Sequence, residues 1–225
     1  DTKMIADVAF YGCRYLTTIT IPKNVKFLGK NIFYDSNNLT EVIVEEGNTV
    51  YEAPNNTVII EKATKTVVLG LNNAVIPEGV TKIGDDAFNN CSLLETIIIP
   101  EGVTSIGDNA FSYCMKLESV TIPNSVTHIG KSAFSDCYKL ASLTIPNKLK
   151  YIGHWTFHRC HSLTTLVVPD SVSYIDEMAF ANCEKLENLT LGSGLVVIGE
   201  VAFSACPALT SITIPDSVKT IESSA

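Results

Sequence analysis

Short runs in which apolar and polar residues alternate recur along the whole chain. One run is formed by Val120 and Ile122, which alternate with Ser119 and Thr121. This period of two is typical of a β-strand that is buried on one face only. Pro123 follows directly and ends the strand, because proline has no N–H group to donate to a strand ladder.

The residues after this proline predict a second strand and a turn. Val126 and Ile129 indicate a second short extended segment with an apolar inner side. Gly130 permits a turn after it. Between Gly130 and Cys137 we expect one short helical or 3₁₀ turn, from which Phe134 and Cys137 face the interior.

The same arrangement returns with a period of 23 residues, except in one irregular unit. A phenylalanine is usually followed by a cysteine after three residues and by a leucine after three more. The phenylalanines are Phe10, Phe33, Phe88, Phe111, Phe134, Phe157, Phe180 and Phe203. This period lies within the range of leucine-rich repeats. Since one coil cannot cover its apolar side alone, we expect the coils to stack into a single solenoid domain over residues 1–225. It should contain eight repeats marked by these phenylalanines, and both end repeats are incomplete.

All seven cysteines of the chain occupy one position of the repeat. They are Cys13, Cys91, Cys114, Cys137, Cys160, Cys183 and Cys206. We interpret them as an interior column of packing thiols, with Ser36 as its one polar break, because free cysteine behaves as a small buried hydrophobe with a weak donor. Disulfides do not fit an odd number of side-by-side cysteines, and zinc sites normally need closer ligand pairs.

The phrase I-P-x-x-V-x-x-I-G-x-x-A-F-x-x-C-x-x-L-x-x-I-x-I-P resembles the Treponema-type, BspA-like leucine-rich repeat. Clear copies begin at Ile76 and Ile122, and we expect local adjustments at Val168, Asp176 and 191–192, which depart from the phrase. The resemblance implies a right-handed, curved, β-rich solenoid with a parallel strand ladder on one face. It also implies a secreted or surface-attached protein, often of a host-associated microbe, that adheres to host or matrix proteins. It implies neither enzyme activity nor a cofactor.

One irregular unit spans residues 45–77, where the spacing is 32 residues. Two β-rich runs within it, joined by residues 62–65, predict a β-hairpin. Insertions in solenoids often form loops on one face, sometimes the binding face. The alternative, which we favour, is a longer coil that still completes the stack.

Composition and charge exclude several classes of protein. The formal net charge is -8, and 16 Lys and Arg residues are scattered among 24 acids, which argues against nucleic-acid binding. No apolar run approaches the roughly 18–20 residues of a membrane span. The chain opens at Asp1 without an initiator Met or a signal peptide, and neither end shows a polar cap. We therefore expect part of a longer extracellular or cell-surface array, whose ends could stack on another copy.

No motif predicts an enzyme or a metal centre. His154, His158 and His161 lie beside Cys160, but this coil is too short for two helical turns, so we expect surface histidines. The acids on turns, such as Asp85–Asp86, lack the cleft that a glycosidase-like carboxylate pair needs. Nucleophile-elbow, Walker and Rossmann motifs are absent from the sequence.

Two surfaces remain as candidates for ligand binding. The strand face carries small, uncharged side chains, which suit strands in general but could also form a platform for a protein or a glycan. Its candidates are Ser119, Thr121, Ser142, Thr144, Thr165, Val167, Asn188 and Thr190. The turn edge beside the cysteines carries larger side chains of the kinds that interface hot spots favour. Its candidates, which we weigh equally with the strand face, are Tyr113, Tyr138, Trp155, Arg159 and His161.

The sequence therefore predicts a secreted or cell-surface adhesion module that binds a protein ligand of a host or matrix, with a glycan as a further candidate. The alternative is a structural spacer that displays another domain and has no ligand of its own. A carbohydrate-active enzyme or lectin would need a carboxylate pair or an aromatic platform, which we do not find. Four N-x-[ST] sequons, at Asn38, Asn55, Asn90 and Asn188, matter only if the source cell glycosylates.

Overall fold

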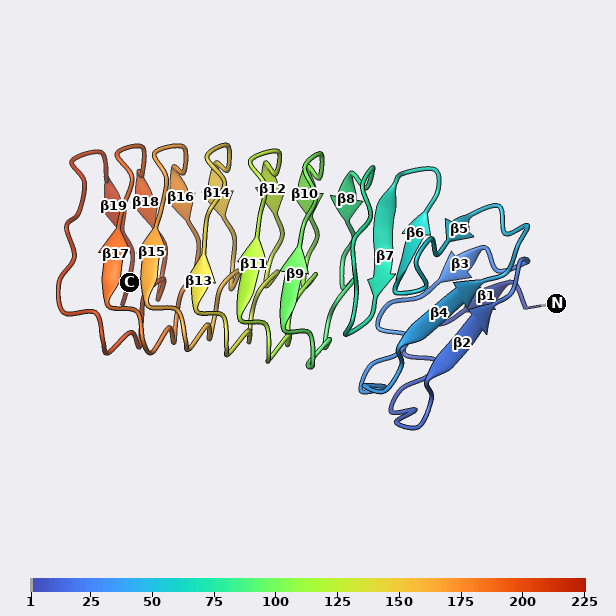
Figure 1. Cartoon of the computed structure of the whole chain (residues 1–225). Coiled ribbons are helices and arrows are strands. Elements are labelled where there is room, and N and C mark those ends of the chain that lie inside the picture. The colour runs from blue at the N-terminus through green and yellow to red at the C-terminus, as the bar shows by residue number, and fades with distance from the viewer. Residues whose placement is uncertain (1) are drawn as a thin grey trace.

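A computed structural model describes residues 2–225 as a row of stacked coils built from short β-strands (Figure 1). The N-terminal strands are β1 (Met4–Ile5), β2 (Thr18–Ile21), β3 (Phe27–Leu28), β4 (Glu41–Val44), β5 (Tyr51–Glu52), β6 (Val58–Glu61) and β7 (Thr66–Gly70). The regular coils contain β8 (Lys82–Ile83), β9 (Thr96–Ile98), β10 (Ser105–Ile106), β11 (Ser119–Thr121), β12 (His128–Ile129), β13 (Ser142–Leu143), β14 (Tyr151–Ile152), β15 (Thr165–Val167), β16 (Tyr174–Ile175), β17 (Asn188–Thr190), β18 (Val197–Ile198) and β19 (Thr220–Ile221).

The predicted parallel ladder is confirmed, and the second extended segment forms a ladder of its own. In β11, Val120 is buried between the exposed residues Ser119 and Thr121. β11 pairs in parallel with β9 and β13, and β15 pairs in parallel with β17. The second ladder joins β8, β10 and β12, and further along it joins β14, β16, β18 and β19 (Figure 1). A regular coil thus contributes one strand to each of two parallel ladders.

The segment between the second strand and the cysteine is not helical. No residue in the described range 2–225 belongs to an α-helix or a 3₁₀-helix. Two residues of a turn instead have left-handed backbone angles, such as Ser132 with φ of 52° and Asp136 with φ of 59°. A helix needs consecutive right-handed residues, so the prediction of a helical turn between Gly130 and Cys137 is wrong.

These turns hold neighbouring coils together. The N–H groups of Ser132 and Phe134 donate to the carbonyls of His154 and Thr156 in the next coil, each with an N···O distance of 2.9 Å. The N–H of Asp136 donates to the carbonyl of His158 in the same way, at 2.8 Å, whereas the N–H of Ser135, between Phe134 and Asp136, bonds the carbonyl of Ser132 within its own turn at 3.1 Å. The alternation gives the solenoid a third column of backbone hydrogen bonds, which we call the turn ladder.

The apolar residues of the repeat face inward and form continuous columns. From Phe88 to Phe203, the phenylalanine rings of successive coils stack with centroids 4.8 to 5.5 Å apart. The leucines that follow the cysteines, such as Leu117 and Leu140, are fully buried. Each coil therefore buries its apolar side against the coils before and after it, as a solenoid requires.

The irregular unit contains a hairpin that lies inside the stack. β6 and β7 pair antiparallel, and β7 pairs in parallel with β8 of the first regular coil. Both faces of the hairpin are buried. On one face, Val58 and Ile60 belong to the core of the regular coils. On the other face, Ile59 and Leu69 belong to a second core, formed with the N-terminal coils. The hairpin is thus a layer between two hydrophobic cores rather than a surface loop.

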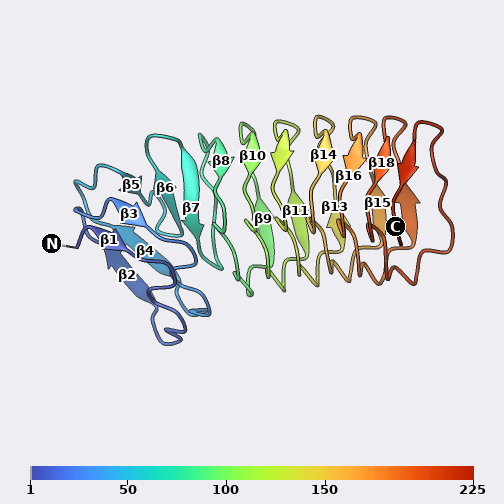
Figure 2. The same ribbon diagram turned by 180° about the vertical axis from the view of Figure 1, so that it is seen from behind.

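The N-terminal coils meet the regular row at an angle. Strands β1 to β4 run obliquely to the ladders that begin at β8, as both views show (Figures 1 and 2). Polar side chains cross the contact, which we call the seam. Lys30 Nζ lies 3.4 Å from Asp85 Oδ2 and 3.2 Å from Asp86 Oδ2, and Ser92 Oγ donates to Asn37 Oδ1 at 3.2 Å.

Candidate interaction surfaces

The eight candidate residues of the strand face are all exposed, on β11, β15 and β17 and along the chain segment that carries β13. The parallel register places Ser119 opposite Ser142 and Thr165 opposite Asn188. The surface they form is uncharged and made of small side chains. The ladder is interrupted in its middle, however, because β13 and β15 are not paired in the part of the chain that the structure describes.

The interruption affects both ladders at one joint, between the coil that carries β13 and the coil that carries β15. One joint earlier, the N–H of Gly130 donates to the carbonyl of Ile106 at 2.9 Å. The equivalent bond from Gly153 to Ile129 is missing from the described chain. On the strand face, the open joint leaves a groove of about 520 Å³ between β13 and β15. We call it the joint groove.

The contacts around the repeat glycines show the same opening. A Cβ atom on Gly130 would lie 2.5 Å from the backbone nitrogen of Asp108, whereas on Gly153 the nearest atoms lie 3.3 Å away and belong to side chains. Thr156 gives a physical reason, because it fills a buried position that is alanine in the neighbouring coils. Its Oγ1 lies 3.4 Å from the carbonyl oxygen of Gly130 and 2.8 Å from that of Gly153. The hydroxyl and methyl groups that threonine has in place of alanine therefore keep the coils of Gly130 and Gly153 apart near Thr156.

Three of the turn-edge candidates come together around one buried carboxylate. The rings of Tyr138 and His161 stack with centroids 4.9 Å apart. Arg159 Nη1 lies 3.4 Å from Asp136 Oδ1, and the Tyr138 hydroxyl donates to the same oxygen at 3.1 Å. Asp136 is only 4% exposed, and no motif in the sequence marks it as a candidate. It fixes the orientation of side chains from two neighbouring coils.

Trp155 extends this group along the turn edge. The rings of His154 and His158 stack on its indole, with centroids 5.0 and 5.3 Å away. Its Nε1 lies 2.8 Å from the sulfur of Met178. We call Tyr138, Trp155, Arg159 and His161 the turn-edge cluster. Tyr113 is exposed in the preceding coil, outside the contacts that hold this cluster.

The histidines point to separate partners. His158 Nε2 lies 3.3 Å from Asn182 Nδ2, and burial lowers the pKa of His158. His154 and His161 lie 3.6 and 3.9 Å from different carboxylates of the next coil. Within residues 2–225, no three His, Cys, Asp or Glu side chains are grouped so that they could hold a metal ion.

The cysteines form the interior column, and all seven are free. The thiol of Cys137 donates to the carbonyl of Phe111 in the preceding coil, and burial raises the pKa of Cys91 to about 12. The five inner thiols are buried, whereas the first and the last cysteine are half-buried. Ser36 is the buried polar member of the column, and its Oγ donates to the carbonyl of Phe10 at 2.8 Å, as the buried thiols do in their coils. Buried neutral thiols pack the core and supply no nucleophile.

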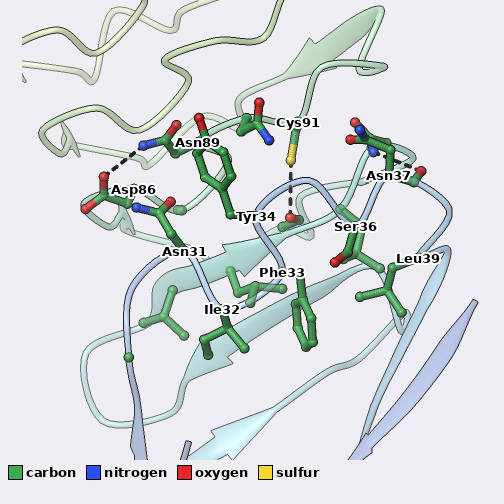
Figure 3. Close-up of a pocket in the computed structure, with 18 residues that line it drawn as sticks. Asn31, Ile32, Phe33, Tyr34, Ser36, Asn37, Leu39, Asp86, Asn89 and Cys91 are labelled. Carbon is green, nitrogen blue, oxygen red and sulfur yellow. Dashed lines mark hydrogen bonds between the residues drawn. The ribbon is translucent and has the colours of Figure 1, made fainter. Parts of the chain in front are cut away.

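A small cavity lies at the seam (Figure 3). Its volume is about 50 Å³, and Asn31, Tyr34 and Asn89 are among its lining residues. Within the described residues, the Oδ1 atoms of Asn31 and Asn89 are buried without a hydrogen-bond partner, while Asn89 Nδ2 donates to Asp86 Oδ1 at 3.1 Å. The space suits one or two waters and is far below the roughly 300–1,000 Å³ of small-molecule sites. The cavity is therefore not a ligand pocket.

Comparisons with known proteins agree with this geometry. A leucine-rich repeat protein from Eubacterium ventriosum is 29% identical, with a TM-score of 0.90 over 99% of this chain and 61% of its own. A leucine-rich cell surface protein from Faecalibacterium prausnitzii is 29% identical, with a TM-score of 0.65 over 99% of this chain and 52% of its own. A leucine-rich repeat protein of Treponema pallidum is 28% identical, with a TM-score of 0.66 over 76% of this chain and 82% of its own. The chain thus spans less than two thirds of the first two proteins.

No protein with curated annotation matches the chain. Residues 2–225 contain no helix long and apolar enough to cross a lipid bilayer. The model of the BspA type leucine-rich repeat region matches in six copies, over residues 1–57, 57–184 and 152–225. Together these matches cover the whole length that the 23-residue period and the stacked coils occupy, and the chain belongs to the BspA-type leucine-rich repeat family.

Proposed function

We propose that the chain is the interaction module of a secreted or cell-surface protein and that it binds a host or matrix protein through its turn edge. Family membership supports protein interaction in general, and one structural relative is described as a cell surface protein. The observation that carries the choice of surface is the turn-edge cluster, because it gathers Trp, Tyr and Arg side chains, the types enriched in interface hot spots.

The cluster is held in place before any partner arrives. Tyr138 and His161 stack on each other, and Arg159 is held by the buried carboxylate of Asp136. Trp155 is 39% exposed and is fixed by its contact with Met178. A partner would therefore lose little side-chain entropy by ordering these groups, which favours affinity. The strand face offers only small side chains, which seldom dominate the energy of an interface.

The test is binding of the thiol-reduced chain to a panel of matrix and serum proteins by interferometry. Trp155→Asn and His161→Ala should each weaken binding about tenfold, as loss of a hot-spot side chain does. Asparagine suits the left-handed backbone at residue 155, where φ is 56°. The matched control is Tyr15→Ala, since Tyr15 is 98% exposed but lies outside the cluster, and this variant should bind like the parent chain.

A second control separates the two surfaces. The double change of Thr121 and Thr144 to Lys places charge on the strand face and should leave binding unchanged. Loss of binding in this variant alone would move the interface to the strand face. A chain that binds no panel protein would favour the alternative of a structural spacer.

A further inference from the structure

The joint groove exposes backbone groups that are paired elsewhere in the ladder. At the next joint, the N–H of Asn188 donates to the carbonyl of Thr164 at 3.1 Å, and the N–H of Val168 donates to the carbonyl of Thr190 at 2.9 Å. At the open joint, the equivalent bonds would run from the N–H of Thr165 to the carbonyl of Ala141 and from the N–H of Ile145 to the carbonyl of Val167. Neither bond is present among the described residues. The bond from the N–H of Thr164 to the carbonyl of Ala141 is missing from residues 2–225 too, although its equivalents, from Ala141 to Glu118 at 3.1 Å and from Glu187 to Thr164 at 3.0 Å, are present at the joints on either side.

These groups determine what a ligand must offer. Each strand that borders the groove contributes one unpaired donor and one unpaired acceptor. Ala141, Thr165 and Val167 are exposed and only Ile145 is buried, so most of these groups are accessible to a ligand that can replace the water at them. The ligand must therefore both donate and accept hydrogen bonds within a short distance.

The side chains of the groove restrict the ligand further. Ser142, Thr144 and Thr165 contribute hydroxyl groups, and Asn147 contributes an amide. Val167 is 56% exposed and offers an apolar surface beside them. Within the described chain the groove is lined by no charged side chain. This lining fits a neutral ligand that is polar at its edge and apolar on one face.

The width of the joint excludes an inserted peptide strand. On the turn edge the same two coils remain bonded, with an N···O distance of 2.9 Å from Ser132 to His154 and 2.8 Å from Asp136 to His158. Insertion of a strand would require roughly 4.8 Å of additional separation, and the intact turn ladder prevents it. A compact ligand fits better, since about 520 Å³ lies within the range of small-molecule sites.

We propose that the joint groove is a binding site for a neutral carbohydrate, in which the exposed side chain of Val167 takes the place of the aromatic platform that the sequence does not offer. A sugar hydroxyl donates and accepts at once, so neighbouring hydroxyls can pair with the unbonded N–H and carbonyl groups of both strands. The C–H face of the sugar ring packs on Val167. This site lies on the strand face and does not depend on the protein binding proposed for the turn-edge cluster.

The experiment screens the chain against an array of neutral oligosaccharides built from glucose, galactose, mannose and N-acetylglucosamine, with calorimetry on the array members that bind. Val167→Asp places a carboxylate against the apolar face of the sugar and should weaken binding at least about tenfold. The matched control is Ile98→Asp, since Ile98 occupies the same repeat position on β9, is 73% exposed and lies outside the groove. This control should bind like the parent chain.

Hydrogen exchange locates the ligand independently of these substitutions. The amides of Thr165 and Ile145 should exchange more slowly when the oligosaccharide is bound. The proposal is overturned if no array member binds, if the Val167 and Ile98 variants bind equally well, or if protection appears elsewhere. Trp155→Asn should leave carbohydrate binding intact, so failure of this site and failure of the proposed protein interface are distinguishable.

Discussion

The thiol of Cys137 donates a hydrogen bond to the carbonyl of Phe111 in the preceding coil, with 3.2 Å between sulfur and oxygen. The same bond recurs from Cys114 to Phe88 at 3.3 Å and from Cys160 at 3.4 Å. The repeated cysteine therefore does more than fill space. It adds a second donor to a carbonyl inside the core, since the carbonyl of Phe111 also accepts from the N–H of Cys114 at 3.3 Å.

This bond predicts that serine is a better replacement for Cys137 than alanine. Ser36 shows that a hydroxyl fits, since it donates to Phe10 at 2.8 Å and accepts from the N–H of Cys13 at 3.0 Å. Cys137→Ala should lower the free energy of unfolding by about 1–2 kcal/mol through the lost bond and the small void. Cys137→Ser should cost clearly less. Urea unfolding measures both, and equal losses would show that the thiol acts by packing alone.

The buried thiols also predict a loss of stability at high pH. Burial raises the pKa of Cys91 to about 12 and raises those of Cys114, Cys137 and Cys160 well above their usual value. Unfolded thiols lose their proton near pH 8.5, while the folded ones keep it. Above that pH the unfolded state binds fewer protons, so the free energy of unfolding falls by up to about 1.4 kcal/mol per pH unit for each thiol.

Urea unfolding at pH 7.5 and pH 9.5 measures this slope. The matched control replaces Cys114 and Cys137 with serine, which does not titrate in this range. The control should show a shallower decline than the parent chain, because two of the titrating groups are gone. An identical decline in both proteins would assign the effect to other groups, such as lysines and tyrosines.

Much of the fold could be predicted from the sequence because each coil repeats the same pattern of inward-facing apolar residues. The alternation of apolar and polar residues around Val120 predicted the first strand of a coil, and the position of Ile129 predicted the second. The helical turn was expected wrongly because left-handed residues are usually Gly, Asn or Asp, whereas Ser132 and Trp155 occupy such positions here. Their backbone is imposed by hydrogen bonds to the next coil, which local propensity does not contain.

The turn-edge cluster could have been predicted by placing residues of successive repeats side by side. Residues 23 positions apart stack in a solenoid of this period, so Asp136 lies beside Arg159 and Tyr138 lies beside His161. The joint groove could not be found in this way. It depends on how far two coils close, and Thr156 in place of alanine is too small a change in the repeat phrase to predict an open ladder.

The seam predicts a specific role for Lys30. Its ammonium group lies between Asp85 and Asp86, and the Asp86 side chain is only 8% exposed. Lys30→Met should lower the stability of the N-terminal coils by about 1 kcal/mol, because the buried carboxylate of Asp86 loses its counter-charge. Hydrogen exchange over residues 2–44 measures the change. Lys26→Met is the control, since the bond of Lys26 Nζ among residues 2–225 goes to the hydroxyl of Thr49, at 2.6 Å, and not to a carboxylate.

Equal exchange in the two variants would show that the ion pair does not hold the seam. The regular coils should be unaffected in either case, because the N-terminal residues belong to a separate hydrophobic core. A change that spread into residues 100–190 would instead indicate that the two cores unfold as one unit.

The open joint predicts that alanine is tolerated at one of two equivalent glycines and not at the other. A Cβ atom on Gly130 would meet the backbone nitrogen of Asp108 at 2.5 Å, so Gly130→Ala should destabilise the chain by about 1–3 kcal/mol through forced backbone shifts. On Gly153 the nearest atoms lie 3.3 Å away, in the side chains of Thr156 and Tyr151. Gly153→Ala should therefore stay within about 1 kcal/mol of the parent chain, helped by the smaller entropy of the unfolded state. Guanidinium unfolding measures the free energy of unfolding of both variants. Equal losses would mean that this joint is as tightly closed as its neighbours. The carbohydrate site would then lose its structural basis.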